Sequence, residues 1–354
     1  MRIINKESIL SEKAIHPANA APARWIGGQT MDMAMTFSWV PFALLAMASL
    51  ESPGTLKTLM FYVFLFSFMH QPLSLLLVYG DGERFAMRRK LFIWSPLVFG
   101  MAIFVALQAS PLVLAILAGA WNVEHTLMQR YGITRIYGRM AGQKDGGVEL
   151  LMLFSWLFMA AAWAAADPLT MERVASLGIR GANRSAFELF AEWRSTAEML
   201  LVPLSAVVLI LSSKWLQEER RRTRNPAKHL YVASTLALFV VMILNPIMGF
   251  IGYVGAHSFE YFVIVYHAIE KGYVEPRRVD SALGKAANGP MGRTGLLAGY
   301  IIFIIVLIYV LEHHASYLVY SMVFFTLGAL HFFYDGVIWK LRNPQVARSV
   351  GAVN

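Results

Sequence analysis

Long apolar stretches separated by short polar segments dominate the pattern of the chain. A membrane-spanning helix needs about 20 consecutive, mostly apolar residues, because each residue adds about 1.5 Å along the axis and the hydrocarbon core is about 30 Å thick. The sequence predicts one such helix in each of ten stretches: 31–50, 55–79, 91–109, 110–130, 149–166, 196–213, 229–246, 247–270, 294–312 and 316–338. We therefore expect an all-α fold, a polytopic transmembrane helical bundle.

Two of these boundaries fall inside nearly continuous apolar runs, from Leu91 to Gln129 and from Leu230 to Glu270. As a single helix, each run would be about 60 Å long, which is twice the thickness of the hydrocarbon core. Pro111 and Pro246 disfavour helical geometry in the residue before them. The chain is therefore expected to reverse direction at these two prolines.

The composition supports the same class of protein. Hydrophobic residues make up 57% of the chain and charged residues 15%, with a mean hydropathy of +0.52, whereas soluble domains carry about 45–50% apolar and 25% charged residues. The absence of cysteine from the sequence excludes Cys-ligated zinc and iron–sulfur sites, so any protein ligands to a metal must be sought among His, Asp and Glu. We attribute the net charge of +9 to membrane topology and predict no nucleic-acid partner.

The positions of Lys and Arg predict the orientation of the spans. With ten spans, most basic residues fall in alternate loops, and the positive-inside rule then predicts that both termini are cytoplasmic. The opposite loop at about 167–195 is the exception, because it also carries arginines. Within it, Phe187, Phe190 and Trp193 lie at helical spacing among charged residues, which predicts a helix lying in the extracytoplasmic interface.

This topology predicts three regions and a cellular location. Residues 1–30 form a cytoplasmic or interfacial segment without the pattern of a cleavable signal peptide, 31–338 form the transmembrane domain, and 339–354 form a cytoplasmic tail. We expect a multi-pass protein of the bacterial inner membrane.

Histidines are distributed unevenly among the predicted spans. Five of the nine histidines fall within spans, and all five lie on spans predicted to run from outside to inside: His70, His125, His257, His267 and His331. Counting back from the cytoplasmic ends at 1.5 Å per residue places all of them except His267 at depths of roughly 8–20 Å. Four imidazoles from four helices are therefore expected to share one layer.

The spacing of residues along the helices places two carboxylates on the same helical faces as histidines of this layer. Glu260 follows His257 by three residues, and Asp335 follows His331 by four, so each carboxylate shares a helical face with an imidazole. Ionisable groups within a bilayer are costly and normally face a cavity, a partner or a metal. His267 continues the stripe of His257 and Glu260, nearer the predicted membrane boundary.

Neutral imidazole and carboxylate are ligands that suit iron, zinc or manganese. The predicted metal ligands are His70, His125, His257, Glu260, His331, Asp335 and His267. The predicted catalytic residues are Glu260, Glu124 and Tyr334. Di-iron proteins built on helical bundles also carry carboxylate and His at i,i+3 on inward faces, although here the His comes first. We expect iron, in a mononuclear or dinuclear centre.

These observations predict an integral-membrane metalloenzyme, a non-haem iron oxygenase or desaturase. Its substrate would be a membrane lipid or another apolar small molecule, oxidised in the cytoplasmic half of the bilayer with electrons from a cytoplasmic donor. Drawing histidines from several helices is similar in broad architecture to fatty-acid desaturases and hydroxylases and to bacterial carotene-cleaving dioxygenases. The HxxxH and HxxHH boxes of the desaturase group are absent, so no residue is assigned by that similarity.

Two other functions fit the same residues. A zinc-dependent hydrolase would use a metal-bound water, with Glu260 or Glu124 as the base. A haem protein, or an ion- or proton-coupled transporter, would use paired histidines or a chain of His, Asp and Glu. Considered singly, each buried His would more often be a hydrogen-bond partner between helices than a metal ligand.

Overall fold

The computed structural model describes residues 23–177, 181–275 and 277–352, and these residues form helices and connecting turns with no strand among them. Ten segments are long and apolar enough to cross a membrane, as the sequence predicts. They are α1 (Gln29–Thr36) with α2 (Trp39–Ser49), α3 (Pro53–His70) with α4 (Leu73–Tyr79), α6 (Arg89–Ala109), α7 (Pro111–Met140), α8 (Gly147–Ala166), α11 (Arg194–Arg221), α12 (Pro226–Leu244), α13 (Pro246–Ile269) with the π-helical turn Glu270–Val274, α15 (Gly292–His314) and α16 (Tyr317–Ile338).

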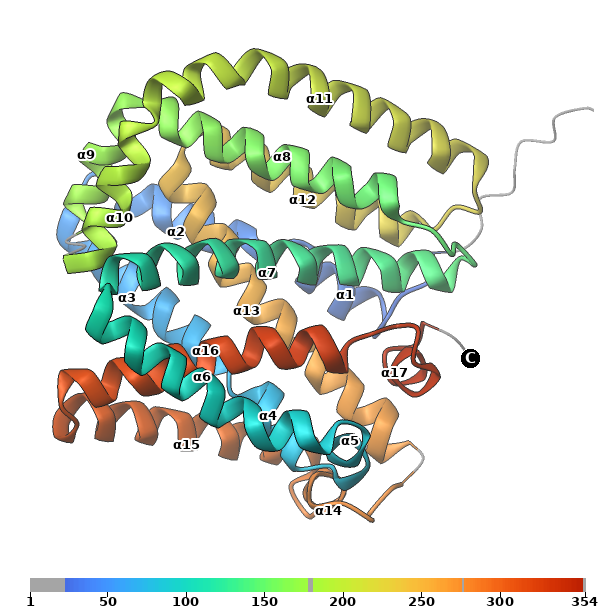
Figure 1. The fold of residues 1–354 in the computed structure, drawn as a ribbon. Coiled ribbons are helices and arrows are strands. Elements are labelled where there is room, and N and C mark those ends of the chain that lie inside the picture. Colours follow the sequence, from blue (N-terminus) through green and yellow to red (C-terminus); the bar gives the residue numbers. More distant parts are fainter. Residues whose placement is uncertain (1–22, 178–180, 276, 353–354) are drawn as a thin grey trace, which may run out of the picture.

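Five shorter helices lie between or after these segments: α5 (Gly82–Met87), α9 (Pro168–Ser176), α10 (Gly181–Glu192), α14 (Ala282–Ala287) and α17 (Pro344–Ser349). α10 confirms the helix predicted inside the loop 167–195, and it lies with α9 at the end of the bundle opposite to the described chain ends (Figure 1). Its location in a membrane interface stays a prediction. Of the predicted N-terminal segment 1–30, residues 1–22 lie outside the described residues.

Both predicted reversals at proline are confirmed. α6 ends at Ala109 and α7 begins at Pro111, with the Ser110 hydroxyl accepting a hydrogen bond from the backbone N–H of Val113. In the same way, Asn245 caps α13, which begins at Pro246. Proline suits the first position of a helix because the missing N–H would have no partner there. Each pair of spans is therefore joined by a very short turn.

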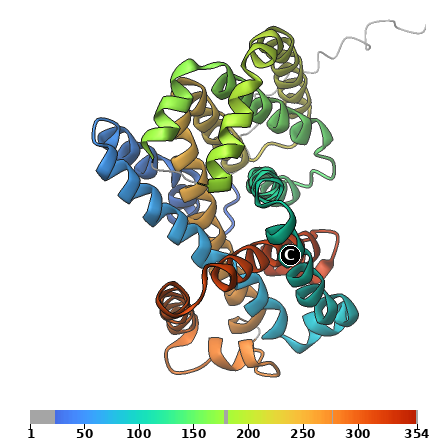
Figure 2. The ribbon, with the colours of Figure 1, turned by 60° about the vertical axis from the view of Figure 1, so that its left-hand side comes forward.

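α13 is the central element of the fold. It runs obliquely through the middle of the bundle in both views (Figures 1 and 2), and it is the most buried of the ten segments. Glycines allow its neighbours to come close: a Cβ atom on Gly252 would lie 3.3 Å from the Trp39 carbonyl oxygen, and one on Gly249 would lie 2.2 Å from Cα of Met242. α13 therefore packs tightly against α2 and α12 and has neighbours on several sides.

The two ends of the described chain meet at one end of the bundle (Figure 1). Ile26, before α1, and Val350 and Ala352, after α17, belong to one apolar cluster. Ten segments that each crossed a membrane would bring both chain ends to one side, and the structure has them at one end. The cytoplasmic location of this end stays a prediction.

A buried ion cluster joins α8, α11 and α12. Lys228 is fully buried, and its Nζ atom lies 2.5 Å from Glu149 and 2.8 Å from Glu219. It also donates to the side-chain oxygen of Gln143, at 2.8 Å. Because all three ammonium protons have acceptors, this buried charge is stabilised by its partners. The ion cluster therefore holds α8, α11 and α12 together.

Candidate metal centre

The structure brings together the four histidines that the sequence places in one layer. His70 is the last residue of α3, His125 lies on α7, His257 on α13 and His331 on α16, and all four side chains are buried. The ring centre of His331 lies 4.7 Å from that of His70 and 4.8 Å from that of His125. The ring centre of His257 lies 4.6 Å from that of His70 and 5.2 Å from that of His125. Four separate helices thus contribute one imidazole each to a single cluster.

A helix break positions the first of these residues. α3 ends at His70 and α4 begins at Leu73, with Gln71 and Pro72 between them. Proline cannot donate the backbone hydrogen bond that a continuous helix needs, and its ring clashes with the preceding turn. His70 is therefore held at the end of a helix, while the first turn of α4 brings Ser74 against His331.

The imidazole nitrogens lie at hydrogen-bond distance from one another, and the same distances are those expected between neighbouring ligands of a small ion. The Nε2 atom of His331 lies 3.1 Å from Nε2 of His70 and 3.1 Å from Nε2 of His125. At about 2.1 Å per metal–nitrogen bond, two neighbouring ligands of one ion lie about 3.0–3.4 Å apart.

Two overlapping sets of residues have ligand atoms within 4.8 Å of one another. One set contains His70, His257 and His331, and the other contains His125, His331 and Asp335. His331 is common to both sets. The arrangement thus provides nitrogen-rich coordination with one carboxylate, a donor set that suits iron, zinc or manganese.

His257 carries buried nitrogens without hydrogen-bond partners. Neither of its ring nitrogens has such a partner among the described residues, although its side chain is almost completely buried. A buried polar atom left unpaired costs about 1–3 kcal/mol. Coordination of an ion would satisfy one of these nitrogens, so the unpaired imidazole fits a metal ligand better than a structural hydrogen-bonding residue.

A hydrogen-bond network fixes the orientation of His331. Its Nδ1 atom lies 2.7 Å from the Ser74 hydroxyl, which donates to Asp335 Oδ1 at 2.5 Å. Because a serine hydroxyl has only one proton, Ser74 must in turn accept the Nδ1–H of His331. Tyr261 also donates to Asp335, at 2.8 Å. The Nε2 lone pair of His331 is thus directed toward His70 and His125, as a metal ligand requires.

Replacing Ser74 by alanine is expected to weaken metal binding about 10- to 100-fold, because partners that orient a ligating His contribute about that much to affinity. The change leaves His331 Nδ1 without its acceptor. Titration against a chelator of known affinity measures the effect. The matched control is Ser95→Ala, which removes a buried hydroxyl that binds Tyr334 outside this network. Equal affinities in the two variants would remove Ser74 from the site.

Glu260 lies outside the two ligand sets. It is fully buried and binds Arg130 of α7, with Nη2 2.8 Å from Oε1, and the side-chain amide of Gln129 lies 3.4 Å from its other oxygen. Gln129 also donates to the backbone carbonyl of His257, which ties α7 to α13 beside the cluster. As placed in the structure, Glu260 neutralises a buried arginine and is not one of the gathered ligand atoms.

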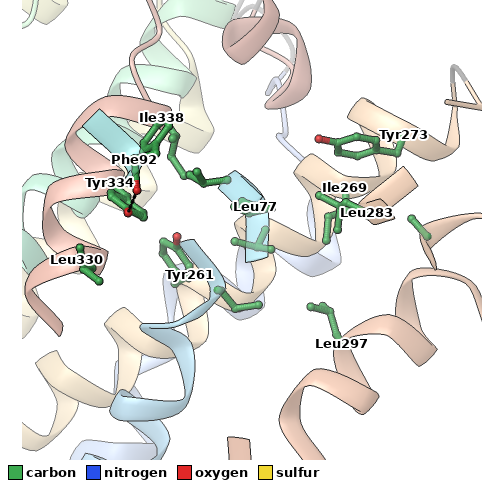
Figure 3. Packing of buried hydrophobic residues seen from close by; sticks show 14 residues of the cluster. Leu77, Phe92, Tyr261, Ile269, Tyr273, Leu283, Leu297, Leu330, Tyr334 and Ile338 are labelled. Carbon is green, nitrogen blue, oxygen red and sulfur yellow. Dashed lines mark hydrogen bonds between the residues drawn. The ribbon is translucent and has the colours of Figure 1, made fainter. Parts of the chain in front are cut away.

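Three other predicted site residues also lie outside the two sets. His267 is beside Gly27, at the end of the bundle where the chain ends meet, and Glu124 is partly exposed on α7. Tyr334 is buried in an apolar cluster next to Phe92 (Figure 3). Its hydroxyl lies 2.7 Å from that of Tyr79. Of the predicted site residues, the structure therefore brings together the four histidines of the layer and Asp335.

Two residues of the network are missing from the sequence-based set. Tyr261 follows His257 by four residues, and Ser74 follows His70 by four. The spacing that singles out Asp335 therefore also singles out Tyr261. The i,i+4 spacing does not by itself place Ser74 beside His70, because the helix is interrupted at Pro72.

No family model matches the chain, and no curated protein or solved structure matches it. The class of protein is therefore described by its structure alone. The described residues form helices without strands, ten segments are able to span a membrane, and a buried cluster of His and Asp could hold a metal ion.

Proposed function

We propose that this protein is an intramembrane metalloenzyme that binds iron through His70, His125, His257 and His331, with Asp335 as a further ligand. The observation that carries the proposal is the 3.1 Å spacing of Nε2 of His331 from Nε2 of both His70 and His125. Bound iron would supply the activation of dioxygen for oxidation, desaturation or cleavage of a lipid-soluble substrate. The chain's own residues hold the ligands and orient His331.

The geometry supports a small ion over haem. Two axial histidines of a haem would place their nitrogens about 4 Å apart, at about 2 Å per bond, on opposite faces of a wide planar ring. Here the rings of His70 and His331 meet edge to face, with Nε2 atoms 3.1 Å apart. His125 and His257 lie against the same pair. The cluster is compact on the scale of a single coordination sphere.

The carboxylates support oxidation over hydrolysis. A hydrolytic site needs a general base within reach of the metal-bound water. Glu260 is bound to Arg130, and one oxygen of Asp335 accepts hydrogen bonds from Ser74 and Tyr261. Glu260 is thus taken up by an ion pair with Arg130, and Asp335 serves in this proposal as a metal ligand, so neither carboxylate is left to act as the base.

A lipid-soluble substrate follows from the position of the cluster. Each of the four histidines lies on a segment able to span a membrane. In the proposed topology both termini face the cytoplasm of a bacterial cell, and electrons come from a cytoplasmic donor. An apolar substrate would reach the site from the surrounding lipid.

Elemental analysis of the purified protein, together with its absorption spectrum, tests this proposal. We expect iron in a fixed ratio of one or two ions per chain, without a Soret band, and consumption of dioxygen by the reduced protein. A Soret band would instead indicate haem, and stoichiometric zinc would indicate a hydrolase. Protein that retains no metal, and binds none when it is offered, would contradict a metal centre of any kind.

A further inference from the structure

An apolar groove opens between α3, α15 and α16. Its volume is about 170 Å³, and the residues that line it are all apolar or aromatic. They include Phe61, Phe64 and Leu65 on α3, Ile308 on α15, and Tyr320 and Phe324 on α16. An apolar cavity of about 150 Å³ is large enough to bind benzene, so this groove has room for about six carbons of a hydrocarbon chain.

The groove lies on the seam that leads to the histidine cluster. Along this seam Phe68 and His70 at the end of α3, and Gln71 just after it, face Phe324, Gly328 and His331 from α16. The three α16 residues are spaced four and three apart, so they occupy one face of the helix. The groove and the candidate metal centre are therefore neighbours along one contact between two helices.

A stacked aromatic pair separates the two. The rings of Phe68 and Phe324 lie 4.8 Å apart and nearly parallel. Such a pair contributes about 0.5–1.5 kcal/mol beyond its buried area, and Phe68 is itself buried. The pair is therefore the wall that a chain entering from the groove would have to displace.

Beyond that pair, Gln71 provides an unpaired polar atom. The side chain is only 8% exposed, and its Oε1 atom has no hydrogen-bond partner among the described residues. It faces Gly328, where a Cβ atom would lie 3.2 Å from this oxygen. A buried acceptor left unpaired costs about 1–3 kcal/mol, and a hydrocarbon chain offers it no donor, so Gln71 marks the polar end of the apolar part of the seam.

We propose that the groove binds the hydrocarbon chain of a membrane lipid and that the α3–α16 seam presents this chain to the histidine cluster. Its walls carry no charged side chain, and Phe61 and Phe64 are exposed on the outside of a segment able to span a membrane. A hydrocarbon chain from the bilayer is therefore the matching occupant. The role of the chain as substrate rests on the proposed metalloenzyme function, whereas its binding does not.

Photolabelling tests the groove directly. The full-length protein is reconstituted in phosphatidylcholine vesicles that contain a phosphatidylcholine with a diazirine at the end of one acyl chain. After irradiation, labelled positions are mapped by mass spectrometry. We expect residues 61–68 and 320–324 to be labelled more strongly than Ile302 and Phe303, which are exposed on α15 outside the groove.

A filling variant and a matched control make the test specific. Leu65→Trp places an indole in the groove and is expected to lower labelling there about tenfold, equivalent to about 1.4 kcal/mol of binding free energy. Phe303→Trp adds the same ring outside the groove and should change nothing. If Leu65→Trp fails to fold, Ile308→Trp fills the groove from the α15 side.

Metal content measured on the same samples separates the two proposals. In one outcome the protein contains metal, but its groove is labelled no more strongly than Phe303 or is labelled equally in the filled variants. This result overturns the lipid groove and leaves the metalloenzyme proposal intact. In the other outcome, the groove is strongly labelled, the filled variants lose this labelling, and the protein binds no metal. The groove then remains a lipid site, but its role as a substrate path and the metalloenzyme function are both overturned.

Discussion

Alanine in place of His331 is expected to abolish stoichiometric metal binding. His331 belongs to both ligand sets, and its Nε2 atom lies 3.1 Å from those of His70 and His125. Loss of a direct ligand should cost more than the 10- to 100-fold expected for an orienting partner, so we expect a loss of more than about 100-fold in affinity. Elemental analysis after removal of free metal measures the remaining content, and His257→Ala should behave in the same way.

The same substitution elsewhere provides the control. His313 and His314 are exposed at the end of α15, and alanine at either position should leave the metal content unchanged. Circular dichroism and thermal unfolding show whether each variant keeps its fold. Equal metal content in the variants of His257, His331, His313 and His314 would refute the ligand assignment.

The spans and their reversals could be predicted because they depend on local properties of the sequence. The length of an apolar run decides whether a helix can cross a membrane, and Pro111 and Pro246 divide the two longest runs. The convergence of His70, His125 and His257 with His331 could be anticipated for a related reason. Once the spans are known, depth in a helix follows from counting residues at a fixed rise.

The position of Glu260 could not be predicted in this way. Residues three apart on a helix point in similar directions, so the sequence places His257 and Glu260 in one site. α13, however, has neighbours on several sides. The imidazole of His257 meets those of His70 and His125, while Glu260 meets Arg130. The spacing of residues along a helix gives the direction in which each side chain leaves the helix axis. Which neighbouring side chain lies in that direction is decided by packing.

The network residues were missed for a chemical reason. A search for metal ligands selects imidazoles and carboxylates, and Ser74 and Tyr261 are neither. Their role becomes visible only when the proton of each hydroxyl is assigned, since Asp335 accepts from both residues and His331 then donates to Ser74. Such an assignment depends on distances between helices, which the sequence does not contain.

Replacing Arg130 by methionine is expected to lower the free energy of unfolding by about 3–5 kcal/mol, because it leaves the Glu260 carboxylate buried without its counter-ion. Both side chains are fully buried, and Arg130 also donates to the Thr235 hydroxyl at 3.1 Å. Reversible unfolding in mixed micelles, followed by circular dichroism, measures the change. As a control, Arg184→Met breaks an exposed pair with Glu188 and should cost less than about 1 kcal/mol.

The double variant Arg130→Met with Glu260→Leu decides what Glu260 does. Replacing both charges by apolar groups removes the desolvation cost together with the attraction, and such exchanges are often neutral or stabilising. If Glu260 only balances Arg130, the double variant should recover most of the lost stability and bind metal as the wild type does. If Glu260 is instead a ligand, the double variant should recover stability but bind metal more weakly than the wild type. That result would show that Glu260 is a metal ligand, as the sequence predicts.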